Sequence, residues 1–311
     1  MKKYLTASLF ACLLAAAPAS ADVPDANCFV RARPDSSQLR LLYDPFAGVQ
    51  ATDELKISFT PRQKGCAFGL AIGGLGSSMQ RQLQGNGRRL TYELQMRGSV
   101  LRNDLNQPSL TFASNPGQGR KGTDQISSPF EDLIVMVPSA QFAPAGTYRD
   151  DVTLRLFQIV NGVPQQTSED VQLSIVVDIP ARAQINLAGT SSPIFGSLGG
   201  SGLDFGQLEA GKERQAYLQV RATAPVMLTL TSENASMLRH RSEKTGAQAI
   251  PYSLSVDNQV IDLSKGPKRI DRTPSQGLGA ENYRMVARIL DVRGRIAGEY
   301  EDVITITVEP R

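Results

Sequence analysis

Tryptophan is absent from the sequence, histidine occurs once, and aromatic residues make up only 6% of the 311 residues. A Ser–His or Cys–His catalytic pair would have to use His240, the single histidine. His240 stands between Arg239 and Arg241, in a polar stretch that is typical of a solvated loop. A metal centre built on histidine and cysteine would lack ligands as well, because the chain has a single histidine. We therefore expect no catalytic site, no metal and no cofactor, and predict that the chain is not an enzyme.

Long apolar runs are also missing beyond the N-terminus, where no segment approaches the roughly 18 uninterrupted apolar residues of a membrane-spanning helix. At the N-terminus, two lysines precede an apolar stretch over residues 5–17. An A-x-A cleavage site ends at Ala21, so residues 1–21 are predicted to be a secretory signal peptide. A lipoprotein signal that ends at Cys12 is the alternative.

Neither sign of charge dominates the chain. Two of the 33 basic residues lie in the predicted signal, which leaves 31 against 30 acidic residues. A protein that binds duplex nucleic acid concentrates far more positive charge, so nucleic acid is not an expected partner. The signal instead predicts export through the periplasm to the cell surface.

Cysteine is scarce. Of the three cysteines, Cys12 leaves with the signal, and Cys28 and Cys66 remain. The periplasm is oxidising, so an even pair in an exported protein predicts a Cys28–Cys66 disulfide. Two buried free thiols are the alternative.

Glycine, proline and short alternating apolar runs are plentiful, with 27 glycines and 18 prolines, and they occur in a pattern that is repeated after about 160 residues. This composition and the near absence of helical periodicity are typical of β-sandwiches. We predict an all-β chain of two immunoglobulin-like sandwiches, over residues 22–182 and 203–311, with a linker or first edge strand over 183–202. The corresponding segments are 41–48 and 203–211, 54–60 and 214–221, 67–72 and 226–231, 90–94 and 250–254, and 143–154 and 295–306.

The two copies end differently. Copy two stops shortly after its strand-like run Ile304–Ile306, whereas copy one turns at Asn161-Gly162 and continues. We predict that the continuation is a strand that closes the first sandwich and that the second sandwich lacks. An open apolar edge is an aggregation hazard, so a partner strand is expected to fill it. The apolar residues of the closing strand alternate at period two, at Val171, Leu173, Ile175, Val177 and Ile179.

Both copies resemble the spore coat protein U family, on the segments Tyr43–Gly48 and Leu203–Gly206 and on the Gly-x-Tyr-x-Asp segments that begin at Gly146 and Gly298. The resemblance covers essentially the whole mature chain, although the second copy has no cysteine. It implies incomplete pilin sandwiches of archaic chaperone–usher pili, which a periplasmic chaperone caps and a neighbour's N-terminal strand completes at the outer-membrane usher. For a two-domain member it implies a tip adhesin with an N-terminal binding domain and a C-terminal pilin domain.

Binding loops of such a domain would expose apolar residues. The candidates are Leu75, Leu110, Phe112 and Phe142, all of which stand among turn-forming residues. Leu75 ends the glycine-rich run 68–76, for which a core strand followed by a turn is the simpler explanation.

Gly206–Lys212 fits seven positions of a phosphate-binding loop. Glu213, however, stands where a magnesium-binding Ser or Thr is needed, so we interpret the segment as a turn between strands.

Three functions remain. A pilus tip adhesin, which mediates attachment to surfaces or host and biofilm formation, explains the signal, the repeat and the missing strand together. A mid-fibre pilin would need a donor strand, yet few mature residues precede Cys28, and among them Pro24 cannot donate to a ladder. A secreted carbohydrate-active protein explains only secretion and β content. Its paired carboxylates could be Asp150-Asp151, but Glu301-Asp302 occupies the matching position, which favours a structural role.

Overall fold

The computed structural model describes residues 29–61, 67–77, 79–113, 130–160, 163–166, 170–192, 194–196, 202–243 and 245–311. The regular secondary structure of these residues consists of strands alone, which confirms the predicted all-β class. Accordingly, the described part of the chain holds no helix with the length and apolar character needed to cross a membrane. The predicted signal and both cysteines of the predicted disulfide lie outside the described residues.

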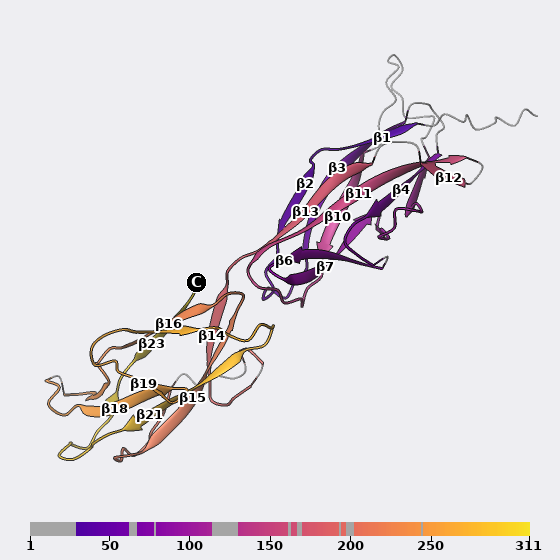
Figure 1. Ribbon diagram of the computed structural model, residues 1–311. Coiled ribbons are helices and arrows are strands. Elements are labelled where there is room, and N and C mark those ends of the chain that lie inside the picture. The colour runs from indigo at the N-terminus through magenta and orange to yellow at the C-terminus, as the bar shows by residue number, and fades with distance from the viewer. Residues whose placement is uncertain are drawn as a thin grey trace, which may run out of the picture.

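The first thirteen strands build one sandwich (Figure 1). They pair along the path β1-β3-β10-β7-β6-β11-β13-β2, with β4 between β9 and β11 and with β12 on β11. The strands are β1 (Val30–Pro34), β2 (Gln38–Leu42), β3 (Ala51–Pro61), β4 (Ala67–Gly73), β5 (Gly76–Ser77), β6 (Gln80–Gly85), β7 (Arg88–Met96), β8 (Ser99–Val100), β9 (Leu110–Ala113), β10 (Phe130–Val137), β11 (Gly146–Val160), β12 (Val163–Gln166) and β13 (Val171–Ile179).

The remaining strands build a second sandwich from two sheets, β14-β15-β21-β18-β17-β22 with β19 on β18, and β20-β16-β23. Residues 183–188, the start of the predicted linker or edge strand, form the first of these strands. The strands are β14 (Ala183–Ala188), β15 (Glu213–Ala222), β16 (Val226–Ser232), β17 (Met237–His240), β18 (Ile250–Val256), β19 (Gln259–Ile261), β20 (Lys268–Arg272), β21 (Glu281–Ile289), β22 (Tyr300–Glu301) and β23 (Ile304–Pro310).

The two sandwiches share one topology. The order of neighbouring strands within the sheet is β14-β15-β21-β18 in the second sandwich and β1-β3-β10-β7 in the first. In the same way, the order β20-β16-β23 corresponds to β9-β4-β11. The register agrees as well: Gln84 pairs with Arg149 in the first sandwich, and Arg239 pairs with Glu301 in the second. The sequence repeat is therefore a repeat of strand pairing, in which residues 146–156 correspond to residues 298–308.

Alternation along the strands produces two separate cores. Side chains of successive strand residues point to opposite faces, so every second residue of a half-buried strand is apolar. In β3 the inward residues are Leu55, Ile57 and Phe59, and all three are buried. The corresponding strand β15 buries Leu218 and Val220 in the same way. The first core is built from residues 30–179 and the second from residues 205–289.

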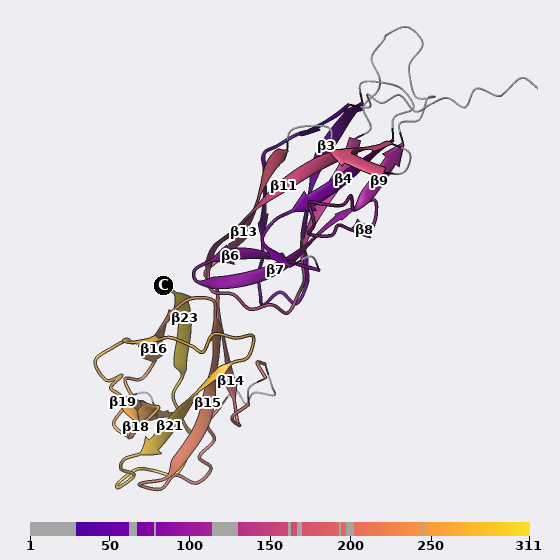
Figure 2. The same ribbon diagram turned by 45° about the vertical axis from the view of Figure 1, so that its right-hand side comes forward.

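The sandwiches lie end to end and touch where β13 leads into β14 (Figure 2). Ala145 of the first sandwich donates its backbone N–H to the carbonyl of Thr223 in the second, at 2.8 Å. The Arg221 guanidinium lies 4.8 Å from the ring centre of Phe46 in the first sandwich and 4.3 Å from that of Phe195 in the second. Cation–π contacts on both sides of one arginine favour a fixed joint.

Candidate functional site

The strongest difference between the two sandwiches lies at one sheet edge. In the first sandwich, β13 pairs antiparallel with β11 over nine residues, from Gly146 opposite Ile179 to Leu154 opposite Val171. On its other side β13 pairs in parallel with β2. The edge of β11 is therefore covered by β13, and β13 is covered in turn by β2. The inward side chains Leu173, Ile175 and Val177 are buried.

The corresponding edge of the second sandwich is open. Strand β23 pairs with β16, and the described residues supply no strand on its other side. The strand is also interrupted: β22 ends at Glu301 and β23 begins at Ile304, whereas β11 runs unbroken through the equivalent positions. A row of backbone N–H and C=O groups is therefore available for another chain to pair with.

The inward side chains of this edge are incompletely covered. Val152, Leu154 and Leu156 of β11 are buried. Their counterparts in β23 are Ile304, Ile306 and Val308, and all three are only half-buried. Because each fully buried side chain of this size contributes about 1.5–3 kcal/mol, covering the edge would add several kcal/mol to the stability of the sandwich.

A groove runs along the open edge. Beside β23 lies a cavity of about 150 Å³, and its lining residues include Met285, Ile304 and Ile306. Leu203 and Phe205 line both this cavity and a cleft of about 790 Å³ beside Gly298–Glu301. The open strand edge and the apolar residues beside it suit an extended segment better than a compact small molecule.

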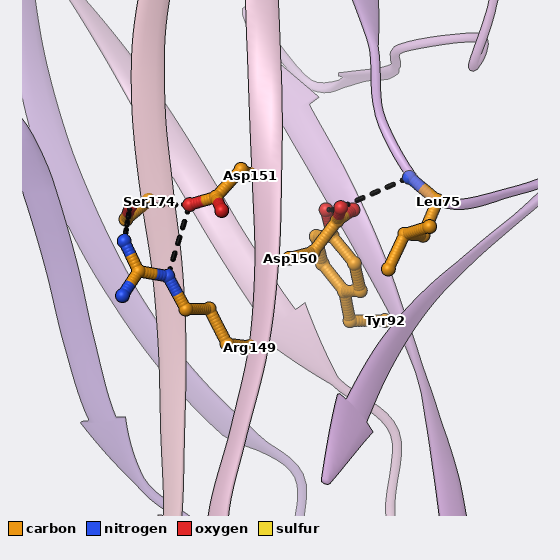
Figure 3. Close-up of polar contacts among 6 residues, drawn as sticks. All are labelled: Leu75, Tyr92, Arg149, Asp150, Asp151 and Ser174. Atoms are coloured by element: carbon orange, nitrogen blue, oxygen red, sulfur yellow. Dashed lines mark hydrogen bonds and ion pairs between the residues drawn. The ribbon is translucent and has the colours of Figure 1, made fainter.

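An aspartate fixes the strand at the same place in both sandwiches. Asp150 in the first sandwich is buried (Figure 3), and Asp302 in the second is half-buried. Asp150 accepts hydrogen bonds from the Tyr92 hydroxyl, at 2.5 Å, and from the Leu75 N–H, at 2.9 Å. Asp302 accepts them from the Tyr252 hydroxyl, at 2.5 Å, and from the N–H of Asn234, at 3.0 Å.

Burial governs the electrostatics of Asp150. Desolvation raises the pKa of the Asp150 carboxyl, although its hydrogen bonds and nearby Arg81 act in the opposite direction. Desolvation likewise lowers the pKa of Arg81. Asp151 points to the opposite face of β11, where Ser174 and Arg149 lower the pKa of its carboxyl (Figure 3). The two adjacent carboxylates therefore face apart, which is not the arrangement of a glycosidase pair.

The four candidate adhesive residues do not gather on one surface. Leu75 is exposed (47%), but Phe112 is buried (4%), stacked on Phe68 at 4.9 Å between ring centres. Leu110 is half-buried beside it in β9. Phe142 is half-buried and packs against Phe46 at the joint between the sandwiches. The expectation that Leu110 and Phe112 lie in a loop is therefore wrong, because this segment is a strand that pairs with β4.

Exposed apolar side chains at the far end of the first sandwich were not identified from the sequence. Phe130 (72% exposed) begins β10, and Val163 (58% exposed) begins β12, which lies at the end remote from the second sandwich (Figure 1). Phe130 stands between Pro129 and Glu131, and Val163 between Gly162 and Pro164, so neither belongs to an apolar run that a sequence pattern would reveal.

The glycine-rich run has a structural cause. A Cβ at Gly69 would lie 2.6 Å from Pro108, and one at Gly73 would lie 2.5 Å from Leu105. The loop that follows β8 crosses β4 so closely that only glycine fits at these positions. The explanation as a core strand followed by a turn therefore accounts for the run.

The remaining sequence motifs show no binding geometry. Gly206 has φ of 59° in a turn, and Glu213 begins strand β15 instead of a helix. His240 lies in β17 with its ring edge-on to Tyr300, 5.0 Å between ring centres. Among the described residues, no three His, Cys, Asp or Glu side chains are grouped as a metal site would require.

No protein-family model and no curated protein matches the chain, so membership of the spore coat protein U family stays a prediction. Among solved structures, the chain is similar to the CsuC–CsuE chaperone–tip adhesion subunit complex from the archaic chaperone–usher Csu pili of Acinetobacter baumannii. The identity is 15%, with 90% of this chain and 100% of that chain covered and a TM-score of 0.47.

The chain is also similar to the CupB6 tip adhesin of Pseudomonas aeruginosa, with 12% identity, 90% and 94% of the two chains covered and a TM-score of 0.40. A weaker similarity is to a family 123 glycoside hydrolase of Clostridium perfringens, with 7% identity, 49% and 27% covered and a TM-score of 0.28.

Proposed function

We propose that the protein is a non-enzymatic subunit of a chaperone–usher pilus. Its second sandwich accepts a strand from a neighbouring subunit along β23. The open edge of β23 supports this most directly, because the equivalent edge of β11 is filled by β13. A strand on β23 would pair the exposed backbone groups and cover Ile304 and Ile306 in one step.

Before assembly the same edge needs protection, since an exposed apolar strand invites aggregation. A periplasmic pilus chaperone would occupy the groove first, and the adjacent subunit would replace it at the outer-membrane usher. The first sandwich needs neither partner, because its closing strand belongs to its own chain. This asymmetry favours a place at the pilus tip, with the first sandwich facing a surface or receptor.

Photo-crosslinking tests the acceptor role. Thr305 on β23 and Thr153 on β11 hold equivalent positions, but Thr153 is paired with β13 through Gln172. A photoreactive amino acid at Thr305 should crosslink to the chaperone in the periplasm and to another subunit in assembled pili. The same group at Thr153 is the matched control and should not. Absence of crosslinks from Thr305 in assembled pili would refute the role.

Attachment and biofilm assays test the tip role. We expect Phe130→Ser with Val163→Ser to reduce attachment while pili still assemble, because both side chains are exposed at the free end. Val260→Ser is the control, since Val260 is equally exposed (70%) but belongs to the second sandwich. Antibody labelling along the whole shaft would show a mid-fibre pilin instead of a tip subunit.

A further inference from the structure

The loop that leads into β6 is longer than its counterpart in the second sandwich. Leu75 and Asn234 hold equivalent positions, because each donates its backbone N–H to the aspartate of the edge strand. Each also accepts a backbone N–H from the strand that follows, from Gln82 in the first sandwich and from Met237 in the second. The additional residues of the first sandwich include β5, for which the second sandwich has no counterpart among its described strands. Insertions in surface loops are a common place for binding residues.

A buried polar cluster holds this loop in place. Asp150 accepts the Leu75 N–H (Figure 3), and the Asn103 side-chain oxygen accepts the Gly74 N–H at 2.7 Å. Asn103 also donates to the carbonyls of Gly74 and Leu75, each at 3.2 Å. Arg81 is buried and donates to Asn103 at 3.1 Å. Burying charged groups in a sandwich core is costly, so their use to fix a surface loop favours a functional role for the position of that loop.

Strand β5 borders two adjacent cavities on the outer face of the β6–β7 hairpin. Leu83 and Leu90 of this hairpin point into the core, so the residues on either side of them point outward. One cavity has a volume of about 390 Å³ and the other of about 360 Å³, and Ser77 lines both. Two neighbouring cavities of this size suit two consecutive rings of a sugar better than one large ligand.

The larger cavity presents hydrogen-bond donors around one positive charge. Among the described residues, Arg89 is the only charged side chain that lines it, and these residues supply no carboxylate partner for Arg89. Its Nη1 donates to the Gln82 side-chain oxygen at 3.0 Å, which leaves Nε and Nη2 of Arg89 and the NH₂ group of Gln82 as donors. Gln84 and Ser77 add exposed polar groups, and exposed Leu75 adds an apolar surface. The cavity therefore favours an anionic, acceptor-rich ligand that also has an apolar face.

The fold does not require these polar residues, because the second sandwich builds the same hairpin without them. The register of the two hairpins aligns Gln82 with Met237 and Arg89 with Ala249. Met237 is half-buried and Ala249 is buried. A methionine and an alanine thus serve the same strand pairing, so the gathering of donors in the first sandwich is better explained by a ligand than by the fold.

We propose that the two cavities bind a carboxylate-bearing sugar, with the acidic ring in the cavity of Arg89 and a neutral ring in the neighbouring cavity. Arginine recognises a carboxylate through two parallel N–H groups, and glutamine amides pair with neighbouring hydroxyls. Glu93 lines the second cavity, where it accepts hydrogen bonds from hydroxyl groups and repels a second carboxylate. The site lies on the first sandwich, so its test does not depend on whether β23 accepts a strand.

Two acidic sugars of different origin test the site on the full mature chain by calorimetry and ligand-observed NMR. Cellobiouronic acid represents a uronic-acid polysaccharide, sialyllactose represents a sialylated glycan, and cellobiose is the neutral reference. We expect at least one of the acids to bind, and cellobiose to bind about tenfold more weakly or not at all, because it lacks the charge-assisted contact. Whichever acid binds more tightly identifies the source of the ligand.

Substitutions locate the binding site. Arg89→Gln should weaken binding of the acid about tenfold, and Gln82→Met, which introduces the residue of the second sandwich, should weaken it as well. Arg269→Gln is the matched control, since it removes the same charge from an exposed position of β20 and should leave the affinity unchanged.

Four outcomes overturn the proposal: neither acid binds, cellobiose binds as tightly as the acids, Arg89→Gln keeps the original affinity, or a glutamate-rich peptide binds as tightly as the sugars. The last result would indicate a site for acidic peptides instead. Crosslinking from Thr305 tests the acceptor role separately, so failure of either proposal leaves the other standing.

Discussion

A matched pair of alanine substitutions measures how far the edge of each sandwich is covered. Leu154 on β11 and Ile306 on β23 hold equivalent positions, but Leu154 is buried at 1% exposure and Ile306 is half-buried. Truncating a buried leucine or isoleucine to alanine costs about 2–5 kcal/mol, because the cavity left behind adds to the lost transfer free energy. We therefore expect Leu154→Ala to lower the free energy of unfolding of the first sandwich by that amount.

Ile306→Ala should cost the second sandwich roughly 1–2 kcal/mol, since part of the side chain already contacts water and no closed cavity forms. Scanning calorimetry of the full chain gives both values, and hydrogen exchange assigns each transition to its sandwich. With a strand bound in the groove, the cost of Ile306→Ala should rise to that of Leu154→Ala. Equal costs in the chain alone would refute the reasoning, because they would mean that the edge of β23 is already covered.

Other predictions concern separate parts of the chain. A Cys28–Cys66 bond should contribute about 3–4 kcal/mol by constraining the unfolded chain, and intact-mass analysis should show the loss of two hydrogens; two alkylatable thiols without reduction would disprove it. Arg221→Ala should loosen the joint and broaden the distance distribution from small-angle scattering, whereas Arg269→Ala on exposed β20 should not. Burial raises the pKa of Asp150, so the folded state holds this proton to higher pH than the unfolded state. This carboxyl therefore reduces stability as pH rises above about 4, and Asp150→Asn should remove that part of the pH dependence.

The strand topology could be predicted because repetition and alternation are properties of the sequence. The Gly-x-Tyr-x-Asp segments at Gly146 and Gly298 occupy the same place in both sandwiches, each leading into the strand that carries the edge. Polar–apolar alternation at period two defines which face of a strand is buried, and it needs no knowledge of the neighbours.

The candidate binding residues were harder to identify, because their burial depends on distant segments. Leu110 and Phe112 look like loop residues, since β9 is only four residues long and its stability comes from pairing with β4. The glycines near Leu75 look like a flexible turn until Leu105 and Pro108 are seen to pack on them. Such tertiary contacts leave no local signal in the sequence.

Hydrogen exchange at the two equivalent strands tests the open edge most directly. In a closed sheet every inner amide is paired, whereas on an open edge alternate N–H groups face solvent. In the full chain without a partner, we predict slow exchange along β11 and fast exchange at alternate amides of Ile304–Pro310, and we predict that those amides become protected once a chaperone or donor strand is bound. Exchange along β23 as slow as along β11 in the chain alone would contradict the account.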